Sequence, residues 1–196
     1  MILGCAYAVS TRVSAGGNAL NSNDCYVSYL PAAHSFEQAV SGLALSVGMK
    51  CGFFGGDVLK LIDDCAILKP TCFPSVPRLY NRIFGKIQDK FKAATGCKGS
   101  LIKNAVAAKL TKLKAGGGFN HCFYDKLVFS KVKAMLGGQA RVMITGSAPI
   151  HGEVLDFLKI AFCSDILEGY GMTETSAGSC ITFPGDPTTG IVGGPL

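Results

Sequence analysis

The chain has 196 residues, of which 48% are hydrophobic and 16% charged, so its composition is that of a globular protein and excludes a disordered or collagen-like chain. Its net charge of +6 is concentrated between residues 86 and 133, where eleven lysines stand against two aspartates. The nine cysteines form no C-x-x-C pair and no Cys/His pair at zinc spacing, so neither a disulfide framework nor a metal knuckle is indicated and a reducing compartment is favoured.

The N-terminal part is expected to begin with the end of an amphipathic helix, residues 1–12, followed by a Ser-, Asn- and Gly-rich loop, residues 13–24. It lacks the basic n-region of a signal peptide. The longest apolar stretch, residues 39–49, is about half of the ~20 residues that a membrane span needs. No transmembrane helix is therefore expected.

Short apolar runs alternate with helical patterns along the rest of the chain. Strands are expected at residues 25–30, 50–54, 71–73, 140–145 and 166–167. Helices are expected at residues 36–47, 79–91 and 153–162, and after Asp57 as N-cap with Leu59, Ile62, Cys65 and Ala66 on its buried face. This alternation predicts an α/β fold with a largely parallel sheet flanked by helices and joined by right-handed crossovers.

The lysine-rich segment, residues 86–133, is predicted to form helices within this fold. The spacing of pairs such as Lys109 and Lys112 suits solvated helix faces, which is the favoured interpretation. Contact with anionic lipid or nucleic acid remains an alternative, although aromatic residues are too sparse for a single-strand binding platform.

Three turns follow predicted strands and should share the carboxyl edge of the sheet, where open α/β folds bind ligands. They hold His34, the residues Gly146 to Pro149, and the residues Tyr170 to Glu174. A lone histidine beside a helix start is more often structural or solvated than functional. The three turns together predict one crevice.

The run Gly-Tyr-Gly, followed by Thr-Glu-Thr, predicts a nucleotide-binding turn. Gly169 and Gly171 would allow unusual backbone conformations and close approach of a ligand, and Tyr170 offers a flat face on which a purine can stack. Thr173 supplies a hydroxyl for phosphate, and Glu174 supplies the kind of carboxylate that Mg²⁺ prefers. For the stretch of residues 166–175 taken alone, an ordinary exit from a strand into a loop, with Tyr170 half buried and Glu174 solvated, is the favoured interpretation.

Six blocks occur in the order and approximate spacing of long-chain acyl-CoA synthetases, members of the adenylate-forming superfamily. The resemblance covers the chain from about Tyr26 to its last residue and is weakest in the lysine-rich segment. The blocks are YLPAAHSFE (29–37), GFFGGD (52–57), PTCFPSVPRLYNR (70–82), ITGSAP (144–149), EGYGMTET (168–175) and PGDPTTGIVGGPL (184–196).

The resemblance implies roles for residues in these blocks. Tyr170 matches the aromatic residue that stacks on adenine, Thr173 the phosphate-binding hydroxyl, and Glu174 the carboxylate that holds Mg²⁺. His34 matches the position beside the acyl carboxylate and the thiol entrance. The remaining matched positions pack beside adenine and the acyl chain, and they are Gly146, Ser147, Ala148, Pro149, Glu168, Gly169 and Gly171. Met172 stands where close relatives often have Gln, which leaves the acyl preference open.

The resemblance also implies that the chain, residues 1–196, is part of the large AMP-binding domain of a longer ligase. The phosphate loop, the ribose-binding Asp, the hinge and the catalytic Lys of the family have no counterpart here. The implied reaction joins a long-chain fatty acid to coenzyme A at the expense of ATP, through an acyl adenylate and with Mg²⁺. The 196 residues alone are expected to be inactive. The implied location is the cytoplasmic side, with peripheral contact to the endoplasmic reticulum or another lipid-handling membrane left open.

Two alternatives remain at this point. An adenylating domain that passes its acyl group to another acceptor would keep the Tyr170 turn. A non-catalytic lipid or nucleic-acid binding module would instead use the lysine-rich segment, and its binding would depend on salt without selecting adenine. No nucleic-acid partner is expected from the family resemblance.

Overall fold

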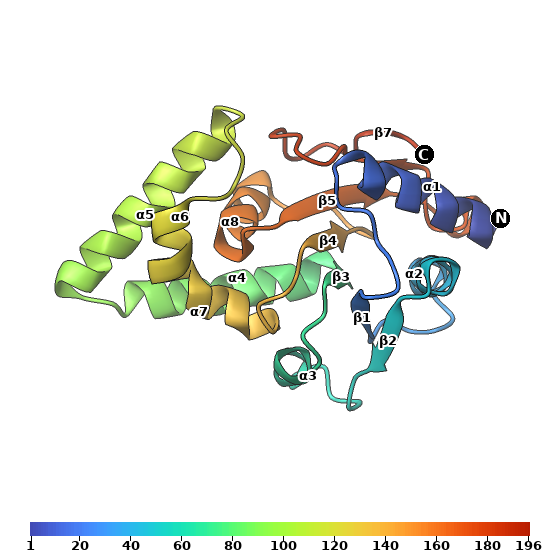
Figure 1. Cartoon of the computed structure of the whole chain (residues 1–196), viewed down its shortest axis with the longest axis horizontal. Helices are drawn as coiled ribbons and strands as arrows, with labels where there is room; N and C mark the ends of the chain where they lie inside the picture. The colour runs from blue at the N-terminus through green and yellow to red at the C-terminus, as the bar shows by residue number, and fades with distance from the viewer.

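The computed structural model describes all 196 residues and is organised around a seven-stranded sheet of order β2-β1-β3-β4-β5-β6-β7 (Figure 1). The first five strands in this order run parallel, whereas β6 and β7 are antiparallel to their neighbours. The strands are β1 (Cys25–Ser28), β2 (Lys50–Phe53), β3 (Cys72–Ser75), β4 (Val142–Thr145), β5 (Asp165–Tyr170), β6 (Cys180–Ile181) and β7 (Gly194–Pro195). The predicted α/β class with a largely parallel sheet is confirmed.

Helices connect the parallel strands, as the alternating pattern predicted. The helices of the chain are α1 (Ile2–Ala15), which precedes the first strand, and then α2 (Ser35–Val47), α3 (Leu61–Leu68), α4 (Pro77–Lys92), α5 (Gly96–Lys114), α6 (Cys122–Tyr124), α7 (Ser130–Lys133) and α8 (Gly152–Phe162). Three short turns complete the set: η1 (Asp125–Phe129, π-helical), η2 (Ala134–Leu136, 3-10) and η3 (Thr173–Thr175, 3-10). No helix is long and apolar enough to cross a membrane.

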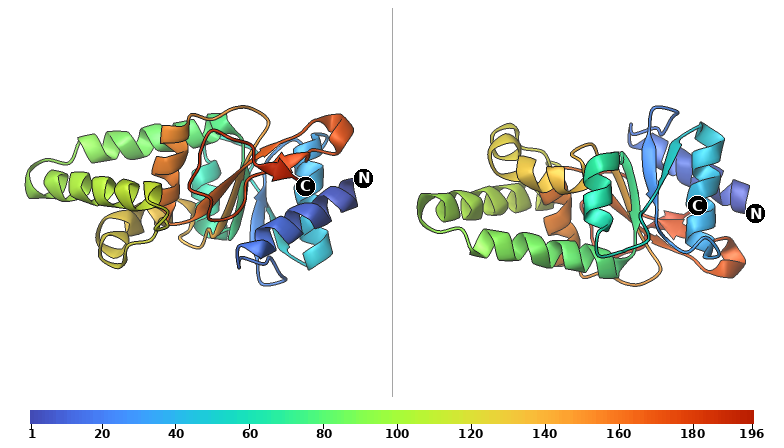
Figure 2. Two further views of the ribbon diagram at one scale, coloured as in Figure 1. Left: turned by 90° about the horizontal axis from the view of Figure 1, so that it is seen from above. Right: turned by 90° about the horizontal axis from the view of Figure 1, so that it is seen from below.

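Helices cover both faces of the sheet, because successive strand residues point to opposite sides. On one face, Tyr26, Cys72 and Leu167 pack with α1 and α2 in a cluster of 13 buried residues. On the other face, Phe73 and Met143 join α3, α4, α5 and α8 in a larger cluster of 25. The helices α4 and α5 lie side by side and extend to the end of the molecule opposite the two termini (Figures 1 and 2).

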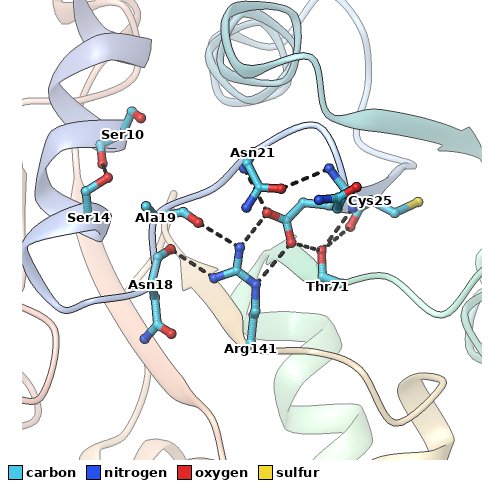
Figure 3. A network of polar contacts seen from close by, with 10 residues as sticks. Ser10, Ser14, Asn18, Ala19, Asn21, Cys25, Thr71 and Arg141 are labelled. Atoms are coloured by element: carbon cyan, nitrogen blue, oxygen red, sulfur yellow. Dashed lines mark hydrogen bonds and ion pairs between the residues drawn. The ribbon is translucent and has the colours of Figure 1, made fainter.

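The amino-terminal edge of the sheet is held by a polar network around Arg141, at the start of β4 (Figure 3). Its Nε donates to Asp24 at 3.0 Å, its Nη2 pairs with the other carboxylate oxygen, and its guanidinium also reaches the carbonyls of Asn18 and Ala19. Thr71, before β3, donates to Asp24 at 2.7 Å and accepts from the Cys25 N–H of β1 at 2.9 Å. One buried carboxylate therefore joins the starts of three strands.

The prediction for the third helix was wrong at its start. The helix begins at Leu61 rather than at Asp57, whose carboxylate accepts from the Leu59 N–H at 2.8 Å in a separate turn. The side-chain oxygen thus stabilises a local turn that competes with the helix. Leu59 and Ala66, expected on the buried face, are exposed, whereas Cys65 is buried as predicted.

The lysine-rich segment forms helices, but one of its lysines is not solvated. Lys109 is fully buried, where it pairs with Asp125, donates to the Ile160 carbonyl at 2.6 Å, and lies 3.1 Å from the Cys163 sulfur. The prediction of a solvated face at this position was wrong. A charge that is buried in this way needs such partners to offset its desolvation.

Candidate functional site

A cavity of about 220 Å³ lies at the carboxyl edge of the sheet, where β4 and β5 end. Its lining brings together the three predicted turns: His34 from the start of α2, Gly146 and Ser147 after β4, and Tyr170 and Thr173 at the end of β5. Parallel strands place their carboxyl ends side by side, so residues more than 130 positions apart meet here. The prediction that the turns form one crevice is confirmed.

Tyr170 is the last residue of β5 and remains 50% exposed. It is followed by Gly171, where an added Cβ would lie 1.7 Å from the Ala177 carbonyl oxygen. The loop from Met172 to Ala177 therefore folds back against Gly171 at a distance that only glycine allows. The Tyr170 side chain lines the cavity and is half exposed there.

The expected role of the two glycines was wrong in one respect. Neither Gly169 nor Gly171 adopts a left-handed backbone conformation, and Gly171 is required for steric reasons instead. Unusual φ angles occur at neighbouring non-glycine residues, Ser147 at 70°, Ser176 at 55° and Ala177 at 80°. Sequence patterns could not identify these positions because such angles are uncommon outside glycine.

The turn after β4 contributes its first two residues to the cavity. Gly146 is buried against the Gly169 carbonyl, which a Cβ would approach at 3.4 Å, and Ser147 is exposed at the mouth. Ala148 and Pro149 are exposed and lie outside the cavity lining.

His34 caps the N-terminus of α2. Its Nδ1 accepts a hydrogen bond from the Phe36 N–H at 3.1 Å, which orients the ring. The side chain is exposed and lines the cavity, so Nε2 is available to a ligand. The structural and the functional interpretations of this histidine are therefore compatible.

Thr173 and Glu174 lie in η3, a turn held by Thr175, whose Oγ accepts from the Met172 N–H at 3.0 Å. Thr173 lines the main cavity, whereas Glu174 is exposed and lines an adjoining depression. The two hollows share the lining residues Cys5, Gly178 and Leu196, so the Glu174 carboxylate lies beside the cavity.

Glu168 is buried and does not line the cavity. Burial raises the pKa of its carboxyl, against the opposing effects of the Gly190 and Ile150 backbone N–H groups and the Lys159 charge. Its Oε2 has no hydrogen-bond partner. In the sheet, Glu168 is paired with Thr145 of β4, which does line the cavity.

Two polar residues near the cavity were missed in the sequence. Thr145, the last residue of β4, is fully buried, lines the cavity and has a hydroxyl without a partner. Glu37, in the first turn of α2, is also buried; its Oε1 accepts from Ser28 at 2.6 Å, and burial raises its pKa. The sequence signal that could have identified them is their position next to the predicted turns: Thr145 precedes Gly146, and Glu37 follows His34.

The residues at the cavity fit a magnesium ion that arrives with phosphates rather than one held in a protein cage. No group of three or more His, Cys, Asp or Glu side chains converges anywhere in the structure. Glu174 is a single exposed carboxylate without an ion-pair partner. Mg²⁺ is commonly bound through one or two carboxylates together with substrate phosphates.

Comparison with known proteins identifies the family. The model of the AMP-binding enzyme family matches residues 3–196. The chain is 47% identical to mouse long-chain-fatty-acid–CoA ligase 5 over 175 residues, which cover 89% of the chain and 25% of the ligase. It is 44% identical to human long-chain-fatty-acid–CoA ligase 1 over 189 residues, covering 95% of the chain and 27% of that protein. The chain thus spans about a quarter of these relatives.

Solved structures with the same fold include a benzoate CoA ligase from Burkholderia xenovorans, with a TM-score of 0.62, 16% identity and coverage of 98% of this chain and 31% of that one. A long-chain-fatty-acid-CoA ligase from Archaeoglobus fulgidus gives a TM-score of 0.54 at 17% identity, covering 97% of this chain and 32% of that one. The chain therefore belongs to the AMP-binding, adenylate-forming enzyme family, and over most of its length its sequence is similar to long-chain-fatty-acid–CoA ligases.

Proposed function

We propose that this chain forms the adenine- and acyl-binding part of a ligase that activates long-chain fatty acids with ATP and transfers the acyl group to coenzyme A. The observation that carries the proposal is the cavity at the carboxyl edge of the sheet, which gathers Tyr170, Thr173, His34 and the Gly146–Ser147 turn. The sequence similarity to long-chain ligases supports the same substrates.

The nucleotide would lie across the ends of β4 and β5. Tyr170 would stack on adenine, since its ring is at the cavity wall, and Gly146 and Gly169 would border the same base. The Thr173 hydroxyl would donate to a phosphate oxygen. Glu174 would hold Mg²⁺, which neutralises phosphate charge when bound.

The acyl group would enter beside His34. The cavity wall next to this residue includes Phe36, Val40 and Leu43 of α2, which suit an alkyl chain. His34, oriented by its bond to the Phe36 N–H, would present Nε2 to the acyl carboxylate and later to the entering thiol. The protein would thus position a carboxylate next to the α-phosphorus without a side-chain nucleophile.

The chemistry has two balanced steps. The fatty acid carboxylate attacks the α-phosphorus of ATP, and pyrophosphate leaves as the acyl adenylate forms. The coenzyme A thiolate then attacks the acyl carbon and displaces AMP. Because the substrate is a lipid, the ligase would act at the cytoplasmic side of a lipid-handling membrane, which it would contact peripherally.

The proposed function is tested by exchange of labelled pyrophosphate into ATP, measured on the complete protein that contains this chain. Exchange should depend on added carboxylic acid and should be faster with palmitate than with benzoate or acetate. Formation of palmitoyl-CoA should require coenzyme A as a separate reactant. Exchange that is independent of any carboxylic acid, or that prefers benzoate, would contradict the proposal.

A further inference from the structure

A second cavity lies far from the first, between α4, α5 and the segment from η1 to η2. Its volume is about 420 Å³, and it shares no lining residue with the cavity at the sheet edge. This volume is within the range of small-molecule sites. The cavity is located in the lysine-rich segment, for which the proposed function gives no role.

The floor of this cavity is apolar. Ile87, Ile102, Val128 and Val132 line it and are otherwise buried in the larger core cluster. Most of the remaining wall is also hydrophobic, so that nine of the 12 residues lining the whole cavity are hydrophobic. Water in such a hollow gains few hydrogen bonds, so an alkyl chain that replaces it is favoured.

The other three lining residues are lysines, one from each surrounding helix. Lys90 comes from α4, Lys98 from α5 and Lys131 from α7. All three are exposed, and none takes part in an ion pair. Of the two acidic residues in the segment, Asp125 is paired with Lys109 and Asp89 does not line the cavity. The mouth therefore carries uncompensated positive charge.

We propose that this cavity is a second ligand site, which binds one amphipathic anion: a single long alkyl chain with a carboxylate head. The chain lies on the apolar floor, and the head faces the three lysines. A concave hollow whose apolar residues lie below a charged rim suits one molecule, whereas binding to a membrane surface uses an apolar helix face that is exposed to the bilayer. The inference is independent of the proposed function.

The test uses the complete protein without ATP and a palmitate analogue with a photoreactive diazirine in its chain. After irradiation, labelled peptides are identified by mass spectrometry over a range of probe concentrations. Saturable labelling of residues 87–135 is expected. Peptides of residues 34–43 and 169–181 report separately on the first cavity, so failure at one site is distinguishable from failure at the other.

Two variants test the charged rim. Lys98→Glu/Lys131→Glu should raise the half-saturating probe concentration for residues 87–135 about tenfold, because two attractive charges become repulsive. The matched control, Lys103→Glu/Lys114→Glu, changes the net charge equally on exposed α5 lysines that do not line the cavity. It should leave that concentration within about twofold.

The apolar part is tested by Ala93→Trp, which fills the cavity from an exposed wall position and should abolish labelling of residues 87–135. A neutral hexadecanol analogue with the same diazirine should label these residues much more weakly than the palmitate analogue. Absent or non-saturable labelling, or equal effects of the two charge variants, would overturn the proposal. So would labelling that appears only when phosphatidylglycerol vesicles are present, since a membrane surface would then be the ligand.

Discussion

At the residue scale, the cavity edge separates two kinds of polar group. Tyr170, Thr173 and Glu174 are exposed at the end of β5 and in η3, whereas Glu168, two residues before Tyr170, is buried and does not line the cavity. Glu168 and Tyr170 are on the same side of the strand, but Glu168 lies opposite Thr145 of β4, whereas Tyr170 lies beyond the end of β4 and pairs with Cys180 of β6 alone. The residue types in the motif were sufficient to predict that Tyr170, Thr173 and Glu174 lie at the end of a strand. They were not sufficient to predict how these side chains are oriented.

A prediction at this scale concerns the charge of Glu174. Glu174→Gln keeps the shape of the side chain and removes the charge that Mg²⁺ needs, so pyrophosphate exchange should fall at least about tenfold, while ATP binding changes less. The measurement is exchange across a magnesium series on the complete protein. Glu153→Gln, an exposed Glu at the start of α8, serves as the control. Parent-like exchange by Glu174→Gln at every magnesium concentration would exclude the assigned role.

At the element scale, the starts of β1, β3 and β4 are joined through Asp24, which is nearly inaccessible to solvent. Burial raises the pKa of Asp24, but hydrogen bonds from Arg141 and Thr71 outweigh burial and lower it below its ordinary value. The carboxylate therefore contributes stability that is fully present above the unfolded pKa of about 3.9 and is lost as pH falls through the lower folded value.

Asp24→Asn should consequently lower the free energy of unfolding by about 2 kcal/mol at pH 7, because Arg141 loses its partner in a partly buried site. The difference from the parent should shrink as pH falls below about 4. Denaturant unfolding of the complete protein, at pH 7 and at a pH below about 4, measures this difference in the free energy of unfolding. Asp63→Asn, at an exposed position of α3, is the control. A difference that grows in acid would contradict this account of the network.

A second prediction at this scale concerns Lys109, which connects α5 to the end of α8 through the Ile160 carbonyl and to η1 through Asp125. Lys109→Met leaves that carboxylate without its cation and should cost about 3 kcal/mol. Faster amide hydrogen exchange in α5 and α8 would report the loss. Lys103→Met, on the exposed side of the same helix, should stay within about 0.5 kcal/mol of the parent. Equal amide hydrogen exchange rates in Lys109→Met and Lys103→Met would show that the buried contacts of Lys109 do not stabilise α5 and α8.

At the scale of the whole molecule, the sequence predicted the layered α/β architecture because apolar strands and amphipathic helices alternate at distinct periods. It also predicted that the turns after β1, β4 and β5 meet, which follows from parallel strand directions. It could not predict that Lys109 is buried, because its partners Asp125 and Ile160 lie 16 and 51 positions away and only tertiary packing brings them together. The start of α3 was missed because the Asp57 side chain makes a turn instead of a helix cap.

The whole molecule has two separate cavities for which different ligands are proposed. The amino-terminal edge of the sheet is joined by buried hydrogen bonds, whereas the carboxyl edge is open at the cavity that holds Tyr170. The cavity lined by Lys90, Lys98 and Lys131 lies among α4, α5 and α7. The helices α4 and α5 extend to the end of the molecule away from the termini (Figure 1). Ligands at the two sites would contact separate sets of residues.

The central claim, that adenine binds against Tyr170 at the carboxyl edge, is tested most directly by calorimetric titration of the complete protein with ATP. Tyr170→Ala should weaken binding by about 1 to 3 kcal/mol, the contribution of a base stacked on an aromatic ring, and Tyr170→Phe should have little effect. Tyr7→Ala removes an exposed tyrosine side chain of α1 that does not line the cavity, and this variant should bind ATP as the parent does. Unchanged ATP affinity in a folded Tyr170→Ala variant would contradict the claim.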